Sequence, residues 1–132
     1  MAKNLSIGII GAGPGGLALG IFLRKAGFDD FTIFDREDGV GGTWRINTYP
    51  GLACDVKSHL YSYSFDLNAQ WSRMWSGQAE ILQYFERCAH RHRLAGHLVL
   101  NTEIVSARWE PEHHTWRLQT ATGDEHTFDI VV

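Results

Sequence analysis

The chain has 132 residues, of which 44% are hydrophobic and 20% charged, and its formal net charge at pH 7 is −3. This length suits one domain with a real core, and the weak negative charge argues against nucleic acid or an anionic membrane surface as a partner. No apolar run reaches the length of a membrane span, no signal peptide precedes the first strand, and the two cysteines, Cys54 and Cys88, favour the cytoplasm over a disulfide-bonded protein.

The first 35 residues predict a βαβ unit with parallel strands. Residues 5–10 form an apolar run, and residues 11–16 read GAGPGG. Apolar residues then recur at helical spacing from 17 to 27, and a second apolar run covers 31–34. A strand, a glycine turn and a helix N-terminus in this order are typical of a site for a dinucleotide pyrophosphate.

Three glycines of the turn have a physical reason to be there. Gly11 permits the turn, Gly13 lets the backbone approach the phosphates, and Gly16 lets the helix pack close to the strand. Asp35 ends the second strand, where a carboxylate can accept hydrogen bonds from ribose hydroxyls. A surface carboxylate is the alternative interpretation of Asp35.

Residues 36–76 show little clean periodicity and are rich in glycine and aromatic residues. A loop of this length inside a compact domain is uncommon and usually functional. The following segment, 78–94, predicts an amphipathic helix with Glu80 early and basic residues late, which suits the helix dipole.

The last third changes to strand patterns. Residues 97–100 predict a third parallel strand, and residues 104–110, 115–120 and 127–132 alternate apolar and polar residues, as in a three-stranded antiparallel meander. The chain stops inside the last apolar run, so we expect a truncated domain. An open sheet edge left there would promote self-association.

A longer and more specific pattern lies within residues 38–82. It consists of Gly41-Gly42-Thr43-Trp44, Asn47, Tyr49-Pro50-Gly51, Cys54-Asp55, Ser58 and Tyr61-Ser62-Tyr63-Ser64-Phe65. In these residues the chain resembles the FAD-binding half of flavin-dependent monooxygenases. The resemblance is strongest to the Baeyer–Villiger type within the flavin-containing monooxygenase superfamily, and it covers essentially the whole chain.

The resemblance implies an α/β fold, the Rossmann-like FAD-binding domain of the glutathione-reductase type, in which a parallel sheet with helices carries the antiparallel meander. It places the FAD pyrophosphate along Gly11, Gly13, Gly15 and Gly16, and it puts Asp35, where the family usually has Glu, at the adenosine ribose. It also implies contacts of the pyrophosphate and ribityl chain with Gly42, Thr43 and Trp44, of the isoalloxazine with Asp55 and Tyr61, and of the adenine with the backbone of Ile104.

The activity implied by the resemblance is insertion of one oxygen atom from dioxygen into a ketone, by way of a C4a-peroxide on FAD reduced by NADPH. Asp55 is the residue of this chain expected to tune the flavin site electrostatically, although its spacing alone fits a helix or turn cap equally well. The family's second GxGxxG, for NADPH, does not occur in these 132 residues. We therefore expect the NADPH domain and the substrate pocket to lie outside the chain, which would be inactive alone.

Other interpretations remain open. Relatives of this kind oxygenate nitrogen or sulfur, and a non-catalytic module that holds FAD or an adenine nucleotide would need the same glycine turn. A simple NAD-dependent dehydrogenase is disfavoured because an NAD site needs no second glycine pair followed by an aromatic-rich loop. No metal site is predicted: His90 and His92, for example, are two residues apart on a helix and point in different directions.

Overall fold

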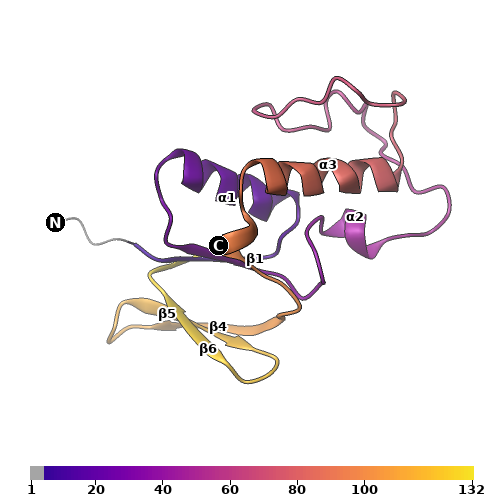
Figure 1. Ribbon diagram of the computed structural model, residues 1–132. Coiled ribbons are helices and arrows are strands. Elements are labelled where there is room, and N and C mark those ends of the chain that lie inside the picture. Colours follow the sequence, from indigo (N-terminus) through magenta and orange to yellow (C-terminus); the bar gives the residue numbers. More distant parts are fainter. Residues whose placement is uncertain (1–4) are drawn as a thin grey trace.

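A computed structural model describes residues 5–132 as two sheets and a layer of helices. Figure 1 shows the helices on one side of the parallel sheet and the antiparallel sheet on the other. In chain order the elements are β1 (Ile7–Ile10), α1 (Pro14–Lys25), β2 (Phe31–Phe34), α2 (Thr43–Ile46), α3 (Gln78–Arg91), the 3₁₀ turn η1 (Ala95–His97), β3 (Leu98–Val99), β4 (Ile104–Glu110), β5 (Thr115–Thr120), β6 (Glu125–Phe128) and β7 (Ile130–Val131).

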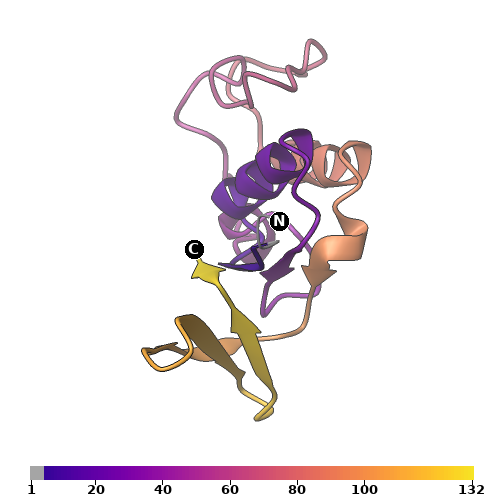
Figure 2. The same ribbon diagram turned by 90° about the vertical axis from the view of Figure 1, so that its left-hand side faces the viewer.

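The parallel sheet has the strand order β3-β2-β1-β7, and β1 pairs with β2 over its whole length. Three of the four residues of β1 and three of those of β2 are buried, because helices cover one face and the second sheet covers the other. Figure 2, turned by 90°, shows the same layers from the side. The expected α/β fold, with parallel strands, helices and a three-stranded antiparallel sheet, is confirmed.

Small residues let α1 lie close to the sheet. A Cβ atom on Gly20 would come within 2.8 Å of Cδ1 of Ile33, so a larger residue there would push the helix outward. Leu17 and Ile21 on the same face are fully buried. The main core continues into α3, whose buried face includes Ile81 and Phe85.

A second, smaller core joins the two sheets. It consists of Phe34 from β2, Leu118 from β5 and Phe128 from β6. The ring of Phe128 lies over Gly8 of β1, where an added Cβ atom would be 2.7 Å from the ring. The antiparallel sheet is thus fastened directly to the central strands that flank the glycine turn.

The last apolar run divides between the two sheets, which corrects the prediction of one meander strand over 127–132. The third strand of the meander is β6, and β7 crosses over to run parallel to β1. Asp129 lies at this crossover, and its carboxylate accepts hydrogen bonds from the backbone N–H and the hydroxyl of Ser6, each 2.9 Å long. The strand pairs with β1 because the backbone N–H and C=O groups along this edge of β1 need hydrogen-bond partners.

Two further boundaries differ from the prediction. The helix predicted over 78–94 ends at Arg91, because Arg93 has a φ of 56°, in the left-handed region that terminates a helix. The residues beyond it form η1, which shortens the third parallel strand from the predicted 97–100 to Leu98–Val99. The long segment 36–76 contains the single helical turn α2.

Candidate nucleotide-binding site

In the glycine turn between β1 and α1, the backbone atoms of Gly11 and Gly16 lie close together. Gly11 has a φ of 107°, and its N–H donates a hydrogen bond of 2.7 Å to the carbonyl of Phe34. A Cβ atom on Gly16 would overlap the carbonyl oxygen of Gly11, so this position accepts only glycine. Gly15, in contrast, is exposed, and a Cβ atom there would meet nothing within 4 Å.

The N-terminus of α1 is left open toward this turn. Pro14 stands at the start of the helix, the N-cap residue Gly13 makes no side-chain cap hydrogen bond, and the first turn carries no acidic residue. The first N–H groups of a helix lack intrahelical partners and carry partial positive charge. This end of α1 is therefore suited to an anion such as phosphate.

A second glycine loop, residues 39–42, packs directly against the turn. The N–H of Gly41 donates to the carbonyl of Ala12 over 2.9 Å. Gly42 has a φ of 55°, and a Cβ atom on it would lie 2.8 Å from Cα of Gly13. The two backbones therefore meet where any side chain would separate them.

The glycines of this second loop have different reasons for being glycine. A Cβ atom on Gly41 would overlap the Leu82 side chain of α3, and one on Gly39 would overlap the guanidinium of Arg45. Of the loop glycines, Gly42 is thus the one whose missing side chain lets the loop backbone contact the glycine turn.

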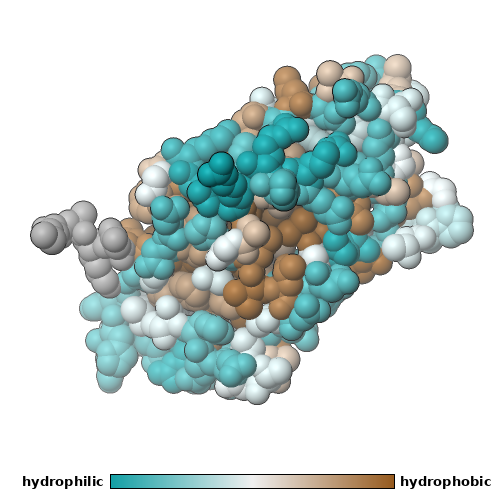
Figure 3. Space-filling view, in the orientation of Figure 1, coloured by the Kyte–Doolittle hydropathy of each residue, from teal (hydrophilic) through white to brown (hydrophobic). Residues whose placement is uncertain are grey.

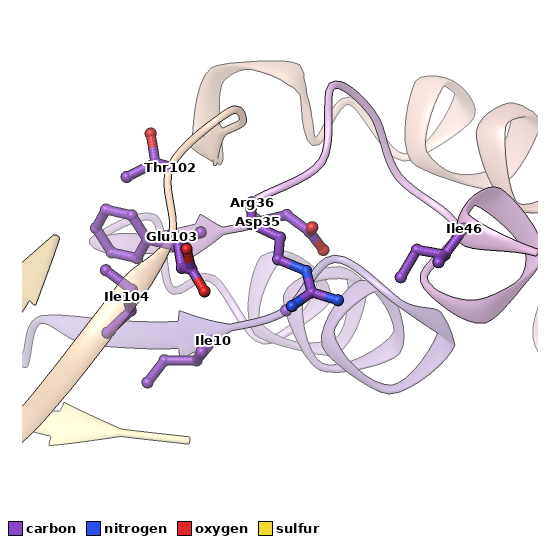
Figure 4. Close-up of a pocket in the computed structure, with 9 residues that line it drawn as sticks. Ile10, Asp35, Arg36, Ile46, Thr102, Glu103 and Ile104 are labelled. Carbon is purple, nitrogen blue, oxygen red and sulfur yellow. The ribbon is translucent and has the colours of Figure 1, made fainter. Parts of the chain in front are cut away.

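A cavity of about 290 Å³ opens beside the glycine turn, at the carboxyl ends of β1 and β2 (Figure 4). Three residues predicted from the sequence, Gly11, Asp35 and Ile104, line it together. The other lining residues are Ile10, Phe34, Arg36, Ile46, Thr102 and Glu103. The carboxyl ends of parallel strands are where α/β folds bind ligands.

The polar part of this lining was not predicted from the sequence. In Figure 4 the Arg36 guanidinium extends into the space between Glu103 and Ile46. Thr102 is brought there by a hydrogen bond of 2.8 Å from its N–H to the carbonyl of Asp35. Arg36 and Glu103 are the sequence neighbours of the predicted Asp35 and Ile104. This adjacency was the one sequence signal that could have indicated their place in the lining.

Asp35 connects the end of β2 to the glycine turn. One carboxylate oxygen accepts a hydrogen bond of 2.6 Å from the N–H of Ala12, and the other accepts one of 2.9 Å from the N–H of Glu37. A carboxylate has about four lone-pair positions, so about two remain for other donors. Asp35 therefore stabilises the turn itself and still offers acceptor capacity to the cavity.

The irregular segment 36–76 is rich in aromatic residues and is called the aromatic loop below. Its residues predicted to contact the flavin end of the cofactor lie in two different environments. Trp44 is buried, and its indole N–H donates to the Tyr61 hydroxyl over 2.8 Å. Thr43 and Asp55 are exposed, and neither lines the cavity. The structure thus brings the glycines, Asp35 and Ile104 together, pairs Trp44 with Tyr61, and leaves Asp55 apart from them on the surface.

Polar side chains tie the aromatic loop to the helices. The Tyr63 hydroxyl donates to the carbonyl of Pro14 in the glycine turn. The Tyr84 hydroxyl of α3 donates to the carbonyl of Asp66 and accepts from the N–H of Tyr63, each over 2.7 Å.

Burial raises the pKa of the neighbouring Cys88 to about 11, so this thiol stays protonated at neutral pH.

Within residues 5–132, no group of three or more His, Cys, Asp or Glu side chains is placed to hold a metal ion. In the same part of the chain, no helix has the length and apolar character needed to cross a bilayer.

Matched alanine substitutions separate the structural glycine of the turn from the exposed one. We expect Gly16→Ala to lower the free energy of unfolding by about 2 kcal/mol or more, because the new methyl group overlaps a backbone carbonyl. Gly15→Ala should leave it within about 1 kcal/mol, since it adds a methyl group in open space on a helix. Urea unfolding followed by circular dichroism measures both, and equal losses would contradict this assignment.

Comparison with known proteins agrees with this geometry. The profile of the NAD(P)-binding Rossmann-like domain family matches residues 9–88. A Baeyer-Villiger monooxygenase of Pseudomonas aeruginosa is 47% identical over 131 residues, which are 99% of this chain and 25% of that protein. An FAD-binding monooxygenase of Botryotinia fuckeliana is 43% identical over 122 residues, 88% of this chain and 23% of that protein.

The crystal structure of cyclohexanone monooxygenase from Rhodococcus sp. Phi1 bound to NADP⁺ matches with a TM-score of 0.91 at 34% identity, covering 96% of this chain and 25% of that one. This chain thus spans about a quarter of the length of these relatives. The resemblance to Baeyer–Villiger monooxygenases seen in the sequence is confirmed, and the chain belongs to the NAD(P)-binding Rossmann-like domain family.

Proposed function

We propose that this chain is the FAD-binding part of an NADPH-dependent flavin monooxygenase that inserts one atom of dioxygen into a ketone. The observation that carries the proposal is the contact between two glycine loops beside a cavity that Asp35 and Ile104 line. The likeness to proteins named Baeyer-Villiger monooxygenase and FAD-binding monooxygenase supports the choice of cofactor and reaction.

The residues present fit a dinucleotide. The N–H groups at the start of α1 would hold the pyrophosphate, and the missing side chains of Gly13 and Gly42 let the two loop backbones meet beside it. Asp35 would accept hydrogen bonds from the ribose, and Ile10 and Ile104 would contact the adenine. A cavity of about 290 Å³ suits the adenosine end rather than the whole cofactor, since complete ligand sites measure roughly 300–1,000 Å³.

The bound flavin would supply the redox chemistry with NADPH and dioxygen. The task of this chain is to bind and orient it. The buried Trp44 and the partly buried Tyr61 form a hydrogen-bonded pair next to the second glycine loop, and we propose that this pair lines the flavin side of the site. NADPH and the substrate would bind in the remainder of a protein as long as the relatives.

The proposal includes two properties of the chain outside the site. The two cysteines are buried and free, which supports the cytoplasm as its location. Ile130 and Val132, in and just after the edge strand β7, are exposed. Figure 3 shows hydrophobic residues that reach the surface in the middle of one face of the molecule. Self-association through the β7 edge would appear as a dimer in light scattering, and a monomer at high concentration would contradict it.

Binding of FAD to the purified chain tests the cofactor assignment. After incubation with excess FAD and desalting, the wild-type chain should retain the visible flavin bands. Asp35→Ala should weaken binding by about tenfold or more, because it removes a charged acceptor worth about 1.5–3 kcal/mol. Asp35→Glu keeps the carboxylate and should bind.

The control is Asp29→Ala, which removes an exposed carboxylate away from the cavity and should bind FAD as the wild type does. The melting temperature of each variant without FAD shows whether the turn is still folded. A wild-type chain without flavin bands would refute FAD binding by these residues alone.

Asp55 tests the link between this chain and the reaction. We propose that its carboxylate orients a cationic partner beside the flavin, for which its exposed position leaves it available. In the full-length protein, Asp55→Ala should slow ketone oxygenation by about tenfold, or about 1.4 kcal/mol in the barrier. Product formation measured by gas chromatography checks this, with Asp29→Ala as the control, and an unchanged rate would remove the proposed role.

A further inference from the structure

We propose that Arg45 is a positioning residue that holds the second glycine loop against the glycine turn. This inference rests on the proposed function, because the purpose of the held loop is to form one wall of the pyrophosphate site. Arg45 itself lies behind the loop and does not line the cavity.

The Arg45 guanidinium contacts three residues that come from two separate segments of the chain. Its Nε donates to the carbonyl of Val40 over 2.8 Å, within the loop itself. One terminal nitrogen lies 2.9 Å from the carboxylate of Asp38, and the other lies 2.7 Å from that of Glu86 on α3. The residue just before the loop, the loop itself and a helix of the main core are thereby joined to one planar group.

The packing of the loop supports the same role. The guanidinium occupies the space where a side chain at position 39 would lie, which accounts for the buried Gly39. Three residues later the loop reaches Gly42, where a Cβ atom would point at the Cα atom of Gly13. Arg45 therefore supports the outer side of a loop whose inner side meets the turn.

The energetics favour positioning over general stabilisation. An exposed ion pair contributes little to stability, so two such pairs alone would matter little. The Arg45 side chain is only 22% exposed, however, and it adds a hydrogen bond to a backbone carbonyl. A planar fork with several donors can make these contacts together, whereas a lysine ammonium cannot reproduce their directions.

The test compares Arg45→Met with the wild-type 132-residue chain in two measurements. The first is hydrogen exchange of the Gly41 amide by NMR, because this N–H bonds to the carbonyl of Ala12 across the two loops. The second is binding of FAD, ADP and adenosine. We expect Gly41 exchange to accelerate by about tenfold and FAD and ADP binding to weaken by about tenfold, with adenosine binding unchanged.

Three further variants serve as references. Gly39→Ala displaces the guanidinium without removing its charge and should act in the same direction as Arg45→Met, while Arg45→Lys should be intermediate. The control is Arg117→Met in β5, since Arg117 also lies between two carboxylates, those of Glu110 and Glu125, but far from the loop in the fold. It should leave nucleotide binding and Gly41 exchange as in the wild type.

The outcomes separate this inference from the proposed function. Equal weakening of ADP and adenosine, or unchanged exchange at Gly41, would overturn the positioning role. A wild-type chain that binds neither FAD nor ADP would overturn the proposed function. Accelerated Gly41 exchange in Arg45→Met would then still support the positioning of the loop, and unchanged exchange would overturn that as well.

Discussion

The close approach of two backbones, at Gly13 and Gly42, is the constraint on which the rest of this structure depends. The hydrogen bond from Gly41 to Ala12 sets their separation, and a single Cβ atom on Gly42 would be 2.8 Å from Cα of Gly13. Around this contact the fold places β1 and α1 on one side and α3 on the other. A wall made of backbone alone lets a phosphate-bearing ligand come close to N–H donors.

Support for this contact comes from several layers of the molecule. Asp35 holds the turn from the end of β2, Tyr63 holds it from the aromatic loop, and Arg45 holds the opposite loop from behind. The second core, which includes Phe128 over Gly8, fixes the antiparallel sheet beneath the same strands. Each of these groups also stabilises the fold, so the same residues support the geometry of the site and the stability of the domain.

The motifs near the glycine turn were predictable because their chemistry is local. A GxGxxG between an apolar run and a helical pattern requires few long-range contacts, and β1, α1 and β2 appear where the sequence indicated. Asp35 and Ile104, both singled out from the sequence, line one cavity in the structure. Asp55 was harder to place, because a position within a long irregular loop depends on anchors such as Asp66 and Tyr84 that have no sequence pattern.

The fold class, the glycine turn typical of dinucleotide sites and the resemblance to flavin monooxygenases could all be recognised in the amino-acid sequence, since periodicity and short motifs encode them. Contacts in the folded chain, in contrast, were needed to see that residues 130–131 leave the meander to pair with β1, and that packing requires glycine at 39 and 41 while Gly42 faces the turn. Folding also brings Arg36 and Glu103 into the cavity and Arg45 against the loop. These features depend on contacts between residues distant in sequence, which no local pattern records.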